Sequence, residues 1–102
     1  MPNLVGMRLR DEERIAIREA AARFFQAEVR LFGSRVDDAA RGGDIDLFIE
    51  SDLAVSDVAA RRIAMLAHLE RQLGERKVDL VVADGRSDLA IHRVARAHGV
   101  LL

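Results

Sequence analysis

Residues 31–35 read Leu-Phe-Gly-Ser-Arg, and residues 44–50 read Asp-Ile-Asp-Leu-Phe-Ile-Glu. The second segment carries an aliphatic residue at every other position from Ile45, which is typical of a strand that turns one face to a core. The first segment closes on Gly33-Ser34, a pair that ends a strand over 28–32 in a tight turn. The two segments therefore predict two strands with a short spacer between them.

Helical patterns lie on both sides of these strands. Residues 11–25 repeat apolar positions at helical spacing behind an acidic first turn, which the helix dipole favours. A longer helix is predicted from the N-cap Ser56 to Gly74, which is expected to be a left-handed C-terminal residue. The apolar stripe expected on this helix consists of Val58, Ile63, Leu66, Leu69 and Leu73.

The remaining elements are a strand over 77–82 and a last helix that Ser87 caps and that ends before Gly99. The face expected for this last helix consists of Ile91, Val94, Ala95 and His98. With one helical turn within 35–43, the element order is α-β-α-β-α-β-α. Because a full helix joins the second and third strands, we expect them to be parallel neighbours. The predicted fold class is α/β (α+β), with a small mixed sheet of three strands flanked by helices.

Length and composition restrict the classes of function. The 102 residues suffice for one domain over 1–102 and not for two cores. With 16 basic and 17 acidic residues the net charge is −1, which argues against general affinity for nucleic acid. The absence of Cys excludes disulfides, thiolate metal sites and thiol catalysis. Charged residues interrupt the first twenty positions, so we expect no signal peptide, no membrane span and a cytoplasmic location.

Three carboxylates are the candidate metal ligands and catalytic groups. Asp44 and Asp46, at i and i+2 of a strand, project from one face with Cα atoms about 6.5–7 Å apart. Such a pair suits two hard cations about 3.5–4 Å apart that clamp an in-line phosphoryl displacement. Asp79 lies in an otherwise apolar strand, so we expect a buried setting for it, where an ionised group is costly unless it is paired or bound to metal. We therefore expect Asp79 to complete the site from the neighbouring strand.

The turn at 33–35 is the candidate phosphate-binding segment. Backbone N–H groups around Gly33 and the hydroxyl of Ser34 can hold phosphate oxygens. Arg35 follows and is expected either to contact a triphosphate or to pair with the acids. Taken singly, these residues also fit structural roles, since an Asp-x-Asp is commonly solvated surface and Asp79 can pair with Lys77. The combination of turn, Asp-x-Asp strand and third acid favours phosphoryl chemistry.

The histidines do not suggest a second site. His68 falls opposite the expected stripe, so we expect it to be exposed and inert. His92 and His98 are six residues apart and lack helical metal-binding spacing. The apolar end of the chain, residues 100–102, is either a contact surface or a cap on the core.

Phe32-Gly33-Ser34, followed after nine residues by Asp44-Ile45-Asp46-Leu47, resembles the minimal nucleotidyltransferase family of the DNA polymerase β-like nucleotidyltransferase superfamily. The spacer is at the short end of the family's range. The resemblance implies that Asp44, Asp46 and Asp79 bind two Mg²⁺ ions and that Asp79 helps to deprotonate the attacking hydroxyl. It also implies that Gly33 and Ser34 hold the phosphates of the nucleotide, with Arg35 beside them.

Family members of this size resemble antitoxins encoded beside a helical HEPN ribonuclease toxin, which they silence by moving AMP from ATP to a toxin tyrosine. The resemblance thus implies ATP as donor and a toxin partner from an adjacent gene, in a homo- or hetero-oligomer. Two alternatives stay open: an antitoxin that only binds, with a relic nucleotide site, and transfer of AMP to a small molecule such as an aminoglycoside. The short chain leaves little material for a small-molecule pocket, which favours a protein acceptor.

Overall fold

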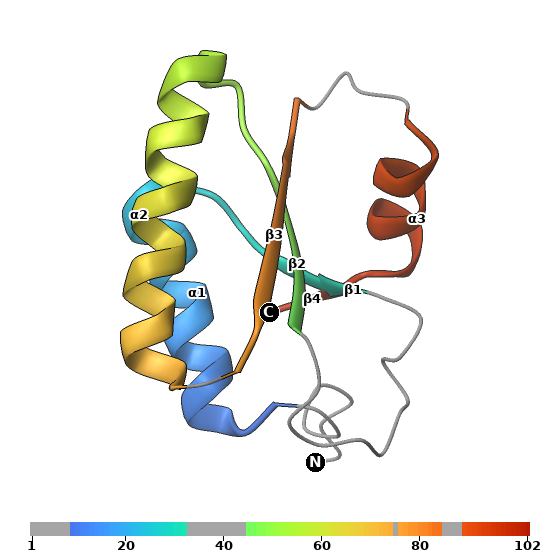
Figure 1. Cartoon of the computed structure of the whole chain (residues 1–102). Coiled ribbons are helices and arrows are strands. Elements are labelled where there is room, and N and C mark those ends of the chain that lie inside the picture. Colours follow the sequence, from blue (N-terminus) through green and yellow to red (C-terminus); the bar gives the residue numbers. More distant parts are fainter. Residues whose placement is uncertain (1–8, 33–44, 75, 85–88) are drawn as a thin grey trace.

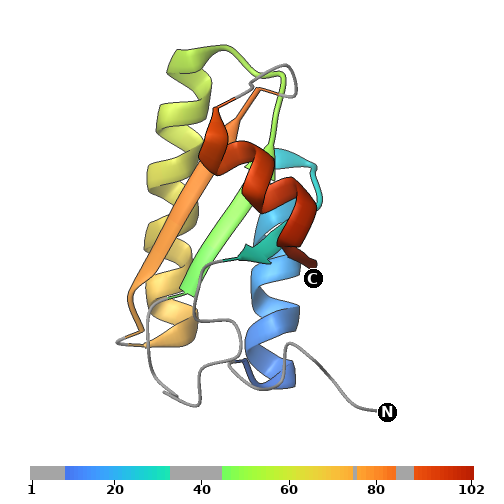
Figure 2. The ribbon, with the colours of Figure 1, turned by 90° about the vertical axis from the view of Figure 1, so that its right-hand side faces the viewer.

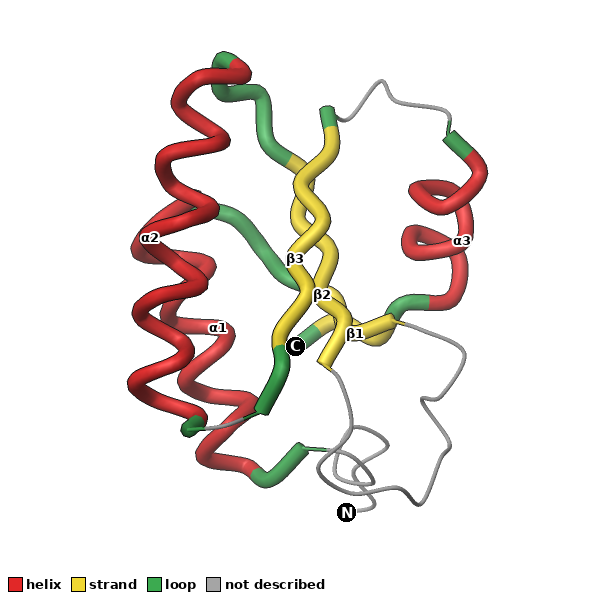
Figure 3. Tube along the Cα trace, viewed as in Figure 1, coloured by secondary structure: helices red, strands yellow, loops and turns green. Residues whose placement is uncertain are grey.

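The computed structural model describes residues 9–32, 45–74, 76–84 and 89–102. In this part of the chain, a four-stranded sheet lies between helices on both of its sides (Figure 1). Helices α1 (Asp11–Phe25) and α2 (Val55–Leu73) cover one face, and α3 (Ala90–His98) lies against the other (Figure 3). The predicted α/β class and the bounds 11–25 of the first helix are confirmed.

The sheet is mixed, with the strand order β3-β2-β1-β4. Strand β2 (Ile45–Glu50) runs parallel to β3 (Val78–Ala83), and α2 connects them, as predicted. Strand β1 (Arg30–Phe32) is antiparallel both to β2 and to β4 (Val100–Leu101). Strand β3 therefore forms one edge of the sheet and has β2 as its neighbour.

The described residues form four strands, so the prediction of three was wrong. Val100 and Leu101 extend the sheet beyond β1 as a two-residue edge strand. Leu102 then buries its side chain, and its backbone N–H donates a hydrogen bond to the carbonyl of Val29 at 2.9 Å. Residues 100–102 were expected to form either a contact surface or a cap on the core, and Leu102 caps the core. The helical turn expected within 35–43 lies outside the described residues.

The main core lies between the sheet and the pair α1 and α2. The inward residues of β2 are fully enclosed, since Ile45, Leu47 and Ile49 are 0% exposed. Ala20 and Ala21 of α1 are also buried, and their small side chains let this helix approach the sheet closely. No helix among the described residues combines the length and the apolar character that a bilayer crossing requires.

The apolar stripe predicted for α2 was wrong at one position. Ile63 is 67% exposed, whereas Met65, Leu69 and Leu73 are buried. Residues on one face of a helix recur every three or four positions, so the face that contains Val58 continues through positions 62, 65 and 69. Position 63 lies off this buried face. Arg62 comes next after Val58 on this face, and its Nε donates to the carbonyl of Leu80 at 2.8 Å. A polar side chain at the margin of the core thus broke the apolar pattern.

The ends of α2 and the face of α3 also differ from prediction. Helix α2 begins one residue before Ser56, with Ala54 as N-cap and no side-chain capping bond. Gly74 has a positive φ of 74°, but its ψ of −133° is not left-handed helical. In α3, Val94 and His98 are exposed, whereas His92 and Ala95 are buried; the side chain of Ile91 lies outside the described part of the structure. Ser87 lies outside the described residues.

Candidate functional site

Three neighbouring strands bring Phe32, Asp46 and Asp79 into one row across the sheet. Asp46 of β2 is the register partner of Phe32 in antiparallel β1 and of Asp79 in parallel β3. Adjacent strands lie about 4.8 Å apart, so the two carboxylate side chains branch from neighbouring backbone positions. The structure thus brings together two of the three acids that the sequence selected, from positions 33 residues apart in the chain.

These carboxylates lie on the face of the sheet opposite to the main core. Side chains alternate along a strand, so Ile45 and Leu47 enter the core while Asp46 and Phe48 point to the side of α3. Asp46 is half-buried and Asp79 is exposed. The expectation that Asp79 occupies a buried setting was wrong, because the apolar residues beside it in sequence face the core on the other side of the strand.

Helix α3 covers part of this face through a second, smaller apolar cluster. Its buried members are Phe32, Phe48, Ala83 and Ala95. The ring of Phe48 packs edge-on to that of Phe32, at 6.4 Å between centroids, and lies 5.7 Å from the ring of His92. Figure 2 shows α3 crossing in front of the strands of this face. Phe32 belongs to this cluster and is the register partner of Asp46. The apolar cluster therefore lies directly beside the two carboxylates.

An ion pair attaches α3 to the far end of β2. The Nε atom of Arg96 lies 2.6 Å from a carboxylate oxygen of Glu50, and its Nη2 donates to the carbonyl of Asp84 at 3.3 Å. The guanidinium also lies over the ring of Phe48, 5.9 Å from its centroid. Asp46 is the second residue of β2 and Glu50 the last, so the anchor of the helix and the carboxylates occupy opposite ends of the strand.

Sequence reasoning missed the residues that build this cover. Arg96 and Glu50 are 46 positions apart, and neither belongs to a motif. His92 lacked metal-binding spacing, and the structure places it as a buried partner of Phe48. His68, expected to be exposed, is half-buried, with its ring 5.6 Å from that of Phe24.

The predicted phosphate-binding residues Gly33, Ser34 and Arg35, and the acid Asp44, lie outside the described residues. The residues on both sides of this segment are placed. Phe32 is the partner of Asp46 in β1, and Ile45 opens β2 and is the partner of Val78. Phe32 and Ile45, the described residues on either side of this segment, therefore lie at the same end of the sheet as Asp46 and Asp79.

The donors present suit a hard divalent cation. Carboxylate oxygens are the ligands that Mg²⁺ and similar ions prefer, whereas zinc sites rely on Cys and His. Asp46 and Asp79 provide such oxygens on neighbouring strands. Within the described ranges there is no group of three or more His, Asp or Glu side chains that could hold a metal ion. Two of the three residues predicted as ligands thus lie within the described part of the chain.

A mixed α/β sheet with paired carboxylates on a half-covered face has the donors that metal-assisted phosphoryl chemistry requires. The model of the nucleotidyltransferase domain family matches residues 14–100, which is most of the chain. The chain therefore belongs to this family and carries a transferase domain for nucleotidyl transfer. Nucleotidyltransferase domains generally use a nucleoside triphosphate and a divalent metal. The comparison with curated proteins found no match.

Proposed function

We propose that this chain transfers AMP from ATP to a hydroxyl group of a partner protein, with Asp46 and Asp79 as metal-binding and catalytic carboxylates. The observation that carries the proposal is the row of Phe32, Asp46 and Asp79 in a chain of the nucleotidyltransferase family. In that row, the strand that leads into Gly33-Ser34 lies directly beside Asp46, and Asp79 lies on the next strand.

In this proposal, the two placed acids and Asp44 hold two Mg²⁺ ions. The ions, when bound, polarise the phosphate oxygens and lower the pKa of the acceptor hydroxyl. Asp79 is exposed, so its carboxylate is accessible to take the proton of a hydroxyl that approaches from solvent. The hydroxyl oxygen forms a bond to the α-phosphorus, and the bond to pyrophosphate breaks.

The chain's own turn residues bind the nucleotide in this scheme. The backbone N–H groups around Gly33 and the hydroxyl of Ser34 hold phosphate oxygens, and Arg35 pairs with the triphosphate. Because this turn follows Phe32 directly, the phosphates would be bound beside Asp46. The proposal needs no covalent enzyme intermediate.

We extend the proposal to the acceptor: a tyrosine of a HEPN ribonuclease toxin encoded by an adjacent gene, which this chain silences as a minimal nucleotidyltransferase antitoxin. The exposure of Asp79 supports a macromolecular acceptor, because a protein surface can reach a carboxylate at the edge strand β3. The chain has no Tyr of its own, so tyrosine modification requires another protein.

The experiment combines the purified chain, Mg²⁺, ATP and the purified product of the adjacent gene, and measures intact masses of both proteins. We expect the partner to gain the mass of AMP. Asp46→Asn should abolish the gain, whereas Asp57→Asn, an exposed acid in the first turn of α2, should preserve it. A stable complex without added mass would instead support an antitoxin that only binds. Transfer to an aminoglycoside and not to the protein would support a small-molecule acceptor.

A further inference from the structure

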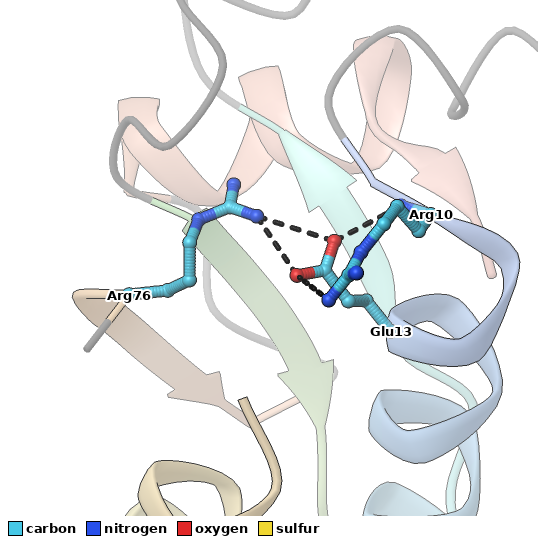
Figure 4. A network of polar contacts seen from close by, with 3 residues as sticks. All are labelled: Arg10, Glu13 and Arg76. Carbon is cyan, nitrogen blue, oxygen red and sulfur yellow. Dashed lines mark hydrogen bonds and ion pairs between the residues drawn. The ribbon is translucent and has the colours of Figure 1, made fainter. Parts of the chain in front are cut away.

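Glu13 is a buried acid in the first turn of α1, far in sequence from every residue of the site. Its carboxylate accepts the backbone N–H of Arg10 at 2.9 Å and two contacts from Nη1 of Arg76, at 3.0 and 3.2 Å (Figure 4). Glu13 is only 4% exposed, and the side chain of Arg76 is 16% exposed. Burying a carboxylate costs free energy unless an opposite charge and hydrogen bonds compensate it. The Glu13–Arg76 contact therefore holds the start of α1 against the segment that leads into β3.

Arg76 connects this contact to the beginning of β3. The next residue, Lys77, accepts the backbone N–H of Ile45 through its carbonyl at 2.9 Å. Ile45 and Val78 then form the first register pair of β2 and β3, and Asp46 and Asp79 form the second. The Glu13–Arg76 contact, the peptide link to Lys77 and the Lys77–Ile45 hydrogen bond therefore connect Glu13 to the strand ends that carry Asp46 and Asp79.

The opposite ends of the same strands have a separate anchor. The backbone N–H of Ser51 donates to the carbonyl of Ala83 at 2.9 Å, and the Glu50–Arg96 ion pair lies beside this bond. The Glu13–Arg76 contact thus lies just before the start of β3, and the Glu50–Arg96 pair lies at the opposite end of the two strands. Strand β3 is an edge strand and gains ladder hydrogen bonds from β2 on one side, so its first residues depend on the anchor at their end.

We propose that Glu13 and Arg76 are positioning residues that hold the start of β3 in register with β2 and thereby keep Asp46 and Asp79 side by side. Glu13 directly precedes the residues that the family matches, 14–100, so membership of the family does not assign it this role. The consequence for metal binding rests on the proposed function, whereas the effect on strand register does not.

The direct test is amide hydrogen exchange by NMR at two matched hydrogen bonds, Ile45 to Lys77 and Ser51 to Ala83. In Glu13→Gln we expect exchange at Ile45 to accelerate about tenfold and exchange at Ser51 to change less than about twofold, because opening is local. Glu50→Gln should show the reverse pattern. Glu12→Gln removes the same charge from an exposed neighbour of Glu13 and should alter neither rate.

Equal acceleration at both amides in Glu13→Gln would overturn the proposal, because Glu13 would then be a general stabiliser. No change at Ile45 would also overturn it, because Glu13 would then not hold the start of β3. If Glu13→Gln does not fold, Arg76→Lys keeps the positive charge but loses the geometry of the guanidinium, and should give the same pattern with a smaller amplitude. A uniform response in that variant would overturn the proposal equally.

The second measurement is the dissociation constant for Mn²⁺, determined by electron paramagnetic resonance without nucleotide. Glu13→Gln should weaken binding about tenfold, the lower end of the loss seen when groups that orient metal ligands are substituted, while Glu50→Gln leaves it unchanged. Unchanged affinity in Glu13→Gln would contradict the role in metal binding. If the unmodified chain binds no Mn²⁺, the proposed function is contradicted, and the exchange rates still decide the positioning role.

Discussion

The two faces of the sheet differ in how completely they are covered. On the side of α1 and α2, the central residues Ile45, Leu47 and Ile49 are 0% exposed. On the side of α3, the same strand presents Asp46, which is half-buried, and its neighbour β3 presents Asp79, which is exposed. One strand therefore supplies the core with one set of alternate residues and the candidate site with the other.

The face under α1 and α2 contributes mainly to stability, whereas the face on the side of α3 carries the candidate site. Burial of apolar surface is the main favourable contribution to folding, and the larger of the two buried clusters lies on the covered face. The other face has a small cluster around Phe48, which attaches α3 and ends at the row of carboxylates. Substitutions on the two faces should therefore affect different measurements, and four predictions test this from the largest effect to the smallest.

Removal of a site carboxylate should affect the rate alone. In Asp46→Asn or Asp79→Asn, the proposed AMP transfer should fall by at least about 10²–10³-fold, the usual loss when a group that stabilises transition-state charge is removed. Without metal the two neighbouring carboxylates repel one another, so the urea midpoint of unfolding should be equal or higher. Initial rates and urea titration measure both effects. A large fall in the urea midpoint would instead assign these acids to the structure.

Truncation of the core face should affect stability. Leu47→Ala should lower the free energy of unfolding by about 2–5 kcal/mol, because the side chain is fully buried under α1 and α2. Val81→Ala, on the side of α3, is half-buried and should cost about 1 kcal/mol. Urea titrations of both variants make the comparison. Equal losses would show that α3 contributes as much burial as the other two helices.

The junction between α3 and β4 should be sensitive to a single methyl group. A Cβ atom at Gly99 would meet the carbonyl oxygen of Ala95 and lie 3.1 Å from the Cβ of Arg30. Gly99→Ala should therefore cost about 1–3 kcal/mol, as overpacking usually does. Ala97→Ser, at an exposed position of the same helix, should cost about 0.5 kcal/mol. Thermal unfolding compares the two, and similar melting temperatures would refute the close approach.

The exposed side of α2 should be nearly insensitive. Ile63→Gln should change the free energy of unfolding by less than about 0.5 kcal/mol, because this side chain is 67% exposed. Leu69→Gln, on the buried side, should destabilise strongly because its amide would be buried in the core. A loss of several kcal/mol for Ile63→Gln would show that Ile63 is buried, as the apolar stripe in the sequence predicts.

Most of the fold could be predicted from local pattern. The bounds of α1 and the alternation of β2 follow from spacing over a few residues. The parallel pairing of β2 with β3 follows from the full helix that joins them. Strand β4 was missed because two residues are too few to show alternation. The position of Ile63 was missed because an arginine at position 62 occupies a place that the apolar pattern needed.

The candidate site could be predicted only in part. The sequence selected Asp46 and Asp79, and the sheet brings them into one row. It gave Asp79 the wrong environment, since exposure depends on where α3 lies, and α3 is positioned by Arg96 and Glu50 across 46 residues. The anchor from Glu13 to Arg76 spans 63 residues and has no sequence motif.

The sequence by itself determined which residues are available for chemistry, which of the longer segments are helices and strands, and which side of β2 is apolar. These properties depend on residue type and on neighbours within one or two turns. Only the tertiary structure decided which strand edges are open, how far each face is covered and which distant charges meet. Those outcomes depend on contacts between remote segments, and local spacing contains no information about them.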